Sequence, residues 1–161
     1  MISKIVKAQE LAERAAQLRA AGRKLVFTNG CFDLLHVGHV RYLAAARALG
    51  DALAVGINGD PSVRILKGAG RPINNESDRA EVLAALESVD LVTIFPEVRA
   101  TRLIEAIRPD IYVKGGDYTP ETLNPEERDA LDRIGAEVSI IPFEAGYSTS
   151  HIIQQLGAAP P

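Results

Sequence analysis

The chain has 161 residues, of which 47% are hydrophobic and 24% charged, and its formal net charge is −3. This composition is typical of a globular protein and excludes a disordered or low-complexity chain, while the weak negative charge argues against nucleic acid as a partner. The single cysteine, Cys31, excludes an internal disulfide and fits a reducing compartment. Because the chain has no apolar run of about 18 residues and no signal-like start, we expect a cytoplasmic protein without membrane attachment.

Short apolar runs alternate with helical patterns along the chain. In chain order they predict a helix over residues 7–21, a strand over 25–28, a helix over 37–49, a strand over 52–57, a helix over 76–88, a strand over 91–95, a helix over 99–107, a strand over 111–113, a helix over 125–134, a strand over 138–141 and a helix over 149–156. This alternation predicts an α/β fold with a parallel sheet, in a single domain over residues 1–161. Ligands of such sheets bind beyond the carboxyl ends of the strands, so the segments that follow strands are the candidate site.

The segment after the first predicted strand carries two histidines. His36 and His39 are three residues apart at the predicted start of a helix, so both rings can face the same side. Gly38 lies between them and leaves the backbone open to a ligand, and the free N–H groups of a helix start attract anions. This combination predicts a polyphosphate site. A zinc site would need a third ligand, which is absent at helical spacing, so we expect no metal ligation by these residues.

The His-x-Gly-His motif follows Thr-Asn-Gly-Cys-Phe-Asp at residues 28–33. With both motifs, the chain resembles the cytidylyltransferase-like branch of the His-x-Gly-His nucleotidyltransferases. The resemblance implies a Rossmann-like sheet with helices on both faces and attack on the α-phosphorus of a nucleoside triphosphate, with pyrophosphate leaving. It makes His36 and His39 the catalytic residues, which bind the phosphates and stabilise the transition state. A phosphate monoester acceptor is mostly dianionic at pH 7, so the reaction needs no general base.

Within this family, the chain is most similar to enzymes that transfer AMP from ATP to D-glycero-β-D-manno-heptose 1-phosphate, for lipopolysaccharide core or surface glycan synthesis. The matching positions are residues 27–33, 66–68, 71–72, 74, 86–90, 109–110, 113–118, 148–149 and 152–153. One departure stands at residues 97–100, which read Glu-Val-Arg-Ala where Asp-Thr-Pro is expected. The resemblance implies ATP as co-substrate, Mg²⁺ bound mainly through the ATP phosphates, and a homodimer or larger homo-oligomer. With the chain length, it also implies a free-standing enzyme without a sugar kinase domain.

The resemblance assigns the loop before the histidines to the nucleotide. Asn29, Gly30, Cys31 and Phe32 would form this loop around the triphosphate, with Cys31 as a small filler rather than a nucleophile. Asp33 either orients a histidine or caps the turn, and we include it among the substrate-binding candidates.

Two further segments add nucleotide-binding candidates. Ser148, Thr149 and Ser150 stand at a predicted helix start, where they cap the helix, bind the β- and γ-phosphates, or do both. Residues 114–117 follow a predicted strand, and the candidates among them are Lys114, Gly115 and Asp117. Paired glycines permit close backbone approach and Lys114 supplies positive charge, although a plain turn has the same residue types.

The loop over residues 67–75 and the helix after it supply the substrate-binding candidates. Lys67 and Arg71 are predicted to bind phosphate, because they lie in a glycine-rich segment beyond a strand end. Arg79 either reaches the same site or lies on a solvated helix face.

Two alternative functions remain open from the sequence. One is a sister transferase that acts on glycerol phosphate, ethanolamine phosphate or FMN, since no residue by itself selects adenine over cytosine. The other is a nucleotide-binding module without catalysis, against which the presence of both histidines argues. A class I tRNA synthetase is discarded, because the chain is too short and has no second lysine-rich signature.

Overall fold

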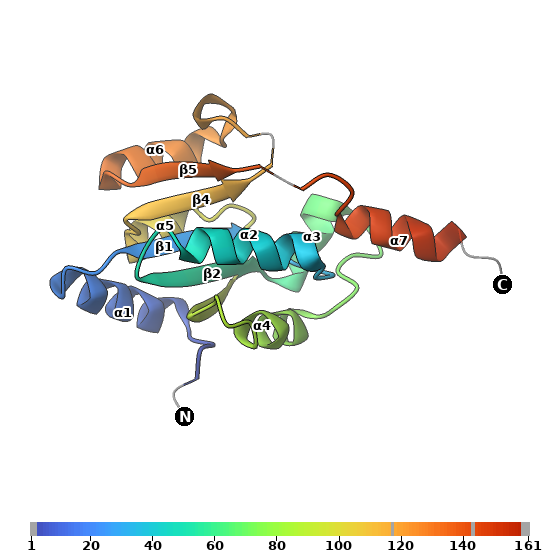
Figure 1. The fold of residues 1–161 in the computed structure, drawn as a ribbon, viewed down its shortest axis with the longest axis horizontal. Helices are drawn as coiled ribbons and strands as arrows, with labels where there is room; N and C mark the ends of the chain where they lie inside the picture. Colours follow the sequence, from blue (N-terminus) through green and yellow to red (C-terminus); the bar gives the residue numbers. More distant parts are fainter. Residues whose placement is uncertain (1–2, 117, 143, 159–161) are drawn as a thin grey trace.

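The computed structural model describes residues 3–116, 118–142 and 144–158. Its strands are β1 (Leu25–Gly30), β2 (Ala52–Asn58), β3 (Leu91–Phe95), β4 (Ile111–Gly115) and β5 (Glu137–Ile141). Neighbouring strands all pair in parallel in the order β3-β2-β1-β4-β5 (Figure 1). The direction of winding therefore reverses between β1 and β4, which is the switch point where Rossmann-like sheets bind ligands. The predicted α/β class and parallel sheet are confirmed.

Helices cover both faces of this sheet, as the resemblance implied. They are α1 (Ala8–Ala20), α2 (Val37–Arg47), α3 (Asp60–Lys67), α4 (Glu76–Ala84), α5 (Thr101–Ile107), α6 (Pro125–Ile134) and α7 (Thr149–Ala158), with a short 3₁₀ turn at Pro120–Thr122. Apolar side chains of α1, α5 and α6 form one core cluster against the sheet, and those of α2 and α4 form a second cluster on the other face. Helix α7 extends away from the body of the molecule (Figure 1).

Helix α3 was not predicted from the sequence. It begins at Asp60 with a proline at its second residue and ends at Gly68, whose φ of 95° is a left-handed conformation that favours glycine. Its buried residues are Ser62 and Val63, whereas Ile65 is 72% exposed. Val63 and Leu66 have helical spacing, but the helix has only eight residues and runs into the glycine-containing loop, so it was missed.

Candidate active site

A cavity of about 580 Å³ opens at the carboxyl ends of β1, β2 and β4, where the sequence predicted the site. It is bounded by the loop after β1, the start of α2, the end of α3, the segments before α5 and α7, and the start of α6. All but two of the predicted site residues line it: Asn29, Gly30, Cys31, Phe32, Asp33, His36, Gly38, His39, Lys67, Arg71, Lys114, Gly115, Ser148, Thr149 and Ser150. The exceptions are Arg79, which lies behind the wall, and Asp117, which lies outside the described residues.

The two histidine rings lie close together, tilted by 35° to each other, at the start of α2. Their ring centroids are 4.0 Å apart, and the Phe32 ring lies 5.5 Å from that of His39. The Nδ1 atom of His39 accepts a hydrogen bond from the backbone N–H of His36 at 3.3 Å. A ring that accepts at Nδ1 carries its proton on Nε2 when it is neutral, so Nε2–H of His39 is left as a donor.

Burial keeps both imidazoles neutral near pH 7. It lowers the pKa of His39 to about 4, to which the neighbouring His36 contributes, and it also lowers the pKa of His36. Two neutral rings at a helix start can each donate one hydrogen bond to a phosphate oxygen. Helix α2 adds the free N–H groups and the partial positive charge of its first turn.

The depressed pKa of His39 makes the stability of the fold depend on pH. The unfolded chain binds more protons at this position between pH 6.5 and about 4, so stability present above pH 6.5 is lost as the pH falls through that window. After discounting for partial exposure, we expect His39 to contribute about 2 kcal/mol of this loss. Urea unfolding at pH 7 and pH 4.5 measures it. Between these two pH values the His39→Asn variant should lose less unfolding free energy than the wild type. An equal loss in both proteins would contradict the assignment of this pH dependence to His39.

Asp33 and Arg71 tie the loop after β1 to the loop after α3. The Asp33 carboxylate accepts from the Arg71 Nε at 2.7 Å and from the backbone N–H groups of Ile73 and Asn74, both at 2.9 Å. Burial alone would raise the pKa of Asp33, but these three donors outweigh it and the pKa is lowered. Asp33 therefore holds the loop rather than either histidine. The Arg71 side chain is 16% exposed and lines the cavity, so its outer nitrogens remain candidates for a ligand.

Arg79 is neither on a solvated helix face nor at the cavity wall. Its side chain is fully buried, and its guanidinium donates to the carbonyl oxygens of Asn74, Cys31 and Asn58 at 3.0, 2.7 and 2.8 Å. It also donates to Oδ1 of Asp60 at 2.7 Å. These bonds join α4 to the ends of β1 and β2. The geometry therefore gives Arg79 a positioning role beneath the cavity in place of the expected contact with substrate.

The start of α7 brings the distant serine and threonine residues to the histidines. Ser148 caps the helix, because its Oγ accepts from the backbone N–H of His151 at 3.0 Å. The Thr149 hydroxyl donates to the carbonyl oxygen of Leu34, two residues before His36, at 2.8 Å. The capping interpretation is thus confirmed, and phosphate binding by the same residues stays a prediction.

Cationic side chains surround the rest of the cavity. Lys67 at the end of α3, Lys114 on β4 and Arg99 before α5 all line it, and within the described ranges none of the three has an ion-pair partner. Burial lowers the pKa of Lys114, the charge of Glu127 raises it, and Arg99 and Lys67 lower it again. An anionic ligand that compensated these charges would relieve their mutual repulsion.

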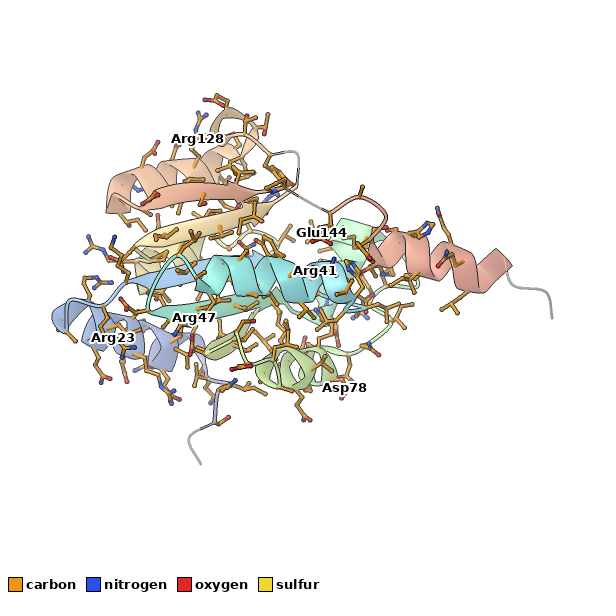
Figure 2. All side chains as sticks on the ribbon, in the orientation of Figure 1. Arg23, Arg41, Arg47, Asp78, Arg128 and Glu144 are labelled. Atoms are coloured by element: carbon orange, nitrogen blue, oxygen red, sulfur yellow. The ribbon has the colours of Figure 1, made fainter. Side chains whose placement is uncertain are left out.

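Several cavity residues were missed by sequence reasoning. Arg41 pairs with Glu144 at 2.5 Å at the mouth, where Figure 2 shows them side by side. The guanidinium of Arg41 also lies 5.9 Å from the Tyr147 ring, which stacks on His36 with centroids 6.2 Å apart. No periodic signal pointed to Arg41, because residues five apart on a helix, as it and His36 are, do not share a face. Nothing local pointed to Glu144, because its partner is 103 residues away.

The departure at residues 97–100 lies at the cavity. Val98 and Arg99 line it, and the Asn58 amide donates to the carbonyl oxygens of Glu97 and Val98, both at 3.3 Å. These bonds hold the segment after β3 against the end of β2, so the departing sequence still forms part of the wall.

Among the described residues, no group of three or more histidine, cysteine, aspartate or glutamate side chains lies close enough to hold a metal ion. None of the helices in the described ranges has the length and apolar character that crossing a membrane requires.

A parallel sheet of this order, with a histidine pair at one helix start and a second helix start beside it at a cationic cavity, places the chain among the α/β nucleotidyltransferases. A model of the cytidylyltransferase-like family matches residues 27–155, and the chain belongs to that family. The resemblance drawn from the motifs is thereby confirmed.

Curated relatives agree with this assignment. The chain is 51% identical over 154 residues to the bifunctional protein HldE of Trichlorobacter lovleyi, covering 96% of this chain and 31% of that protein. It is 52% identical over 146 residues to the HldE protein of a Bradyrhizobium strain, covering 91% of this chain and 29% of the relative. The chain thus spans about a third of the length of the curated relatives it matches.

Solved structures agree as well. The lipopolysaccharide core biosynthesis protein from Thermoplasma volcanium matches with a TM-score of 0.63 and 28% identity, over 76% of this chain and 98% of that one. The pantoate–β-alanine ligase of Francisella tularensis shares the fold, with a TM-score of 0.61 and 14% identity over 92% of this chain and 69% of its own.

Proposed function

We propose that the protein transfers AMP from ATP to D-glycero-β-D-manno-heptose 1-phosphate, which gives ADP-D-glycero-β-D-manno-heptose and pyrophosphate for lipopolysaccharide core or surface glycan synthesis. The observation that carries the chemistry is the close, neutral pair of His36 and His39 at the start of α2, with the start of α7 beside it at the same cavity. The choice of acceptor is supported by the motifs shared along the chain and by the identity of about half the residues with HldE proteins.

The geometry suits an in-line displacement at the α-phosphorus. A phosphate oxygen of the acceptor attacks this phosphorus, the bond from it to the bridging oxygen of the β-phosphate breaks, and pyrophosphate departs with that oxygen. Negative charge then grows on the nonbridging and leaving oxygens, where His39, His36 and the N–H groups at the start of α2 can donate hydrogen bonds. The acceptor phosphate supplies its own electron pair, so no side chain has to remove a proton.

The other candidates fit supporting roles. Ser148, Thr149 and Ser150 would bind the β- and γ-phosphates at the start of α7, and Lys67, Arg71 and Lys114 would offset the charge of the triphosphate and the acceptor. We expect Mg²⁺ to be bound mainly through the ATP phosphates, where it would neutralise part of their charge. The expected homo-oligomer stays a prediction.

The test is pyrophosphate release with ATP, Mg²⁺ and D-glycero-β-D-manno-heptose 1-phosphate. In parallel reactions CTP replaces ATP, and glycerol 3-phosphate replaces the heptose phosphate. The sugar nucleotide product is identified by mass spectrometry. We expect release only with ATP together with the heptose phosphate. Use of CTP in preference to ATP would move the protein to a sister activity, as would turnover with glycerol 3-phosphate but not with the heptose phosphate. Either result would leave the role of the histidines unchanged.

Gly38 provides a prediction about the placement of His36. A Cβ atom at position 38 would lie 2.9 Å from the Cε1 and Nδ1 atoms of the His36 ring and 3.0 Å from the Cβ of Tyr147, so one of them must move. We expect Gly38→Ala to lower kcat/KM about 100-fold, because a shift of about 1 Å in a catalytic group has that effect. Steady-state kinetics with the pyrophosphate assay measure it. Gly157→Ala in α7 is the control, since a Cβ there has nothing within 4 Å, and equal activity of both variants would contradict the prediction.

A further inference from the structure

Glu127 is a carboxylate in the cavity to which the proposed reaction gives no role. It lies in the first turn of α6, is only 4% exposed and lines the cavity. Its Oε1 accepts a hydrogen bond from the backbone N–H of Ala100, directly before α5, at 3.0 Å. Among the residues that the structure describes, no hydrogen bond reaches the other oxygen, Oε2. One oxygen is thus fixed by the protein while the other is left to accept.

The two other carboxylates that line the cavity are already engaged. Asp33 accepts from three donors of the loop after α3, and Glu144 pairs with Arg41 at the mouth. By contrast, Glu127 has no cation within 4.0 Å in the described part of the chain. It lies near the end of β4, where its charge raises the pKa values of Lys114 and Tyr112.

A fixed carboxylate among cations selects the chemistry of its ligand. It repels phosphate oxygens, and the charges of Lys114 and Arg99 near it disfavour a cationic ligand, so a neutral hydrogen-bond donor suits it best. When ionised it accepts hydrogen bonds without donating any. Hydroxyl groups of a sugar meet this description, and a charged acceptor strengthens the bonds they make. Helix α6 packs on the face of the sheet opposite α2, so the carboxylate approaches the cavity from the side away from the histidine helix.

We propose that Glu127 accepts hydrogen bonds from hydroxyl groups of the acceptor sugar and thereby selects a polyhydroxylated acceptor phosphate. This inference rests on the proposed function for the identity of the acceptor. The ribose of ATP presents the same hydroxyl chemistry, and the experiment separates the two sources.

The decisive variant is Glu127→Gln, compared with Glu126→Gln at the exposed neighbouring position. The glutamine keeps an oxygen for the Ala100 N–H but presents an amide NH₂ where Oε2 stood. We expect the KM for the heptose phosphate to rise about 10- to 100-fold, which is the scale of hydrogen bonds to a charged group. The KM for ATP and the melting temperature should stay close to those of the wild type. Calorimetric titration with the sugar phosphate alone gives an independent reading of the same loss.

Acceptors that lack single hydroxyl groups identify the contact. A series of monodeoxy heptose 1-phosphates is tested with the wild type and with Glu127→Gln. The analogue without the recognised hydroxyl should lose affinity in the wild type and lose nothing further in the variant. An equal further loss for every analogue would mean that Glu127 acts through the charge of Lys114, which would overturn the direct contact.

Other results would give Glu127 a different role. A rise in the KM for ATP alone would assign Glu127 to the ribose and overturn the acceptor contact. Unchanged kinetic constants with a lowered melting temperature would mean that Glu127 acts only structurally, through its hydrogen bond to Ala100, and would overturn the proposal. If the wild type rejects the heptose phosphate, the proposed function fails by itself. The comparison of Glu127→Gln with Glu126→Gln is then made with whichever hydroxylated acceptor phosphate the wild type accepts, where an unchanged KM would overturn the inference.

Discussion

Replacing His39 by asparagine should lower kcat about 1000-fold and leave the chain folded. The asparagine Oδ1 can occupy the place of Nδ1 and accept from the backbone N–H of His36, as the imidazole does at 3.3 Å. It provides no donor where Nε2–H stood. Loss of one preorganised donor to developing negative charge typically costs 10²–10³ in rate, about 2.7–4 kcal/mol. Because this bond strengthens in the transition state, the KM for ATP should change much less than kcat.

The complementary variant tests whether donation is the function of this ring. Glutamine at position 39 places an amide NH₂ near the former Nε2 and loses the acceptor for His36. We expect His39→Gln to be about tenfold more active than His39→Asn, although less stable, and stopped-flow measurement of pyrophosphate release compares the two. His151→Asn, on the exposed side of α7, is the control and should keep the wild-type rate. Equal inactivity of both position-39 variants would indicate proton transfer by the ring rather than a fixed donor.

Removal of the Arg79 guanidinium should cost about 3–5 kcal/mol of folding free energy, the scale found when one partner of a buried ion pair is removed. Arg79→Met fills a similar volume but leaves Asp60 and the carbonyl oxygens of Cys31, Asn58 and Asn74 without their donor. Buried acceptors that lose their donor bear the cost of desolvation without compensation. Chemical denaturation of the purified variant gives the value, and Arg64→Met on the exposed face of α3 should change stability by less than about 0.5 kcal/mol.

The same variant separates positioning from substrate contact. If Arg79 only holds the ends of β1 and β2 together, saturating substrate should stabilise the folded variant. Its kcat, which is reached at saturation, should then fall less than its kcat/KM. If the guanidinium touches substrate, Arg79→Lys should retain part of the affinity, whereas a positioning role predicts that lysine fails because it cannot reach four acceptors. Full stability of Arg79→Met would show that the four bonds contribute nothing and would reject the assignment.

Local patterns were sufficient for most of the elements. The strand over residues 91–95 and the helix over residues 125–134 begin and end where the sequence predicted, since apolar runs, proline and glycine define them within a few residues. Asn75 caps α4, because its side chain accepts from the N–H of Asp78, and asparagine is a residue type preferred at this position. The histidine motif was equally local, and its spacing was enough to predict two rings at a helix start. The cavity followed from the known geometry of parallel sheets.

Contacts between polar residues far apart in the sequence could not be predicted from local patterns. In the sequence Arg79 is a polar residue of an amphipathic helix, yet it is buried because its acceptors, up to 48 residues away, converge on it. Glu127 carries no motif and enters the site because α5 and α6 begin at the same edge of the sheet. A periodic pattern indicates which face of a helix or strand is buried. It does not indicate which polar groups on that face form hydrogen bonds with one another. Periodicity and motif spacing were therefore sufficient for the class of fold and the histidine pair. Packing between distant elements determines which charged side chains support the cavity and, within the described residues, leaves one oxygen of Glu127 to accept from a ligand.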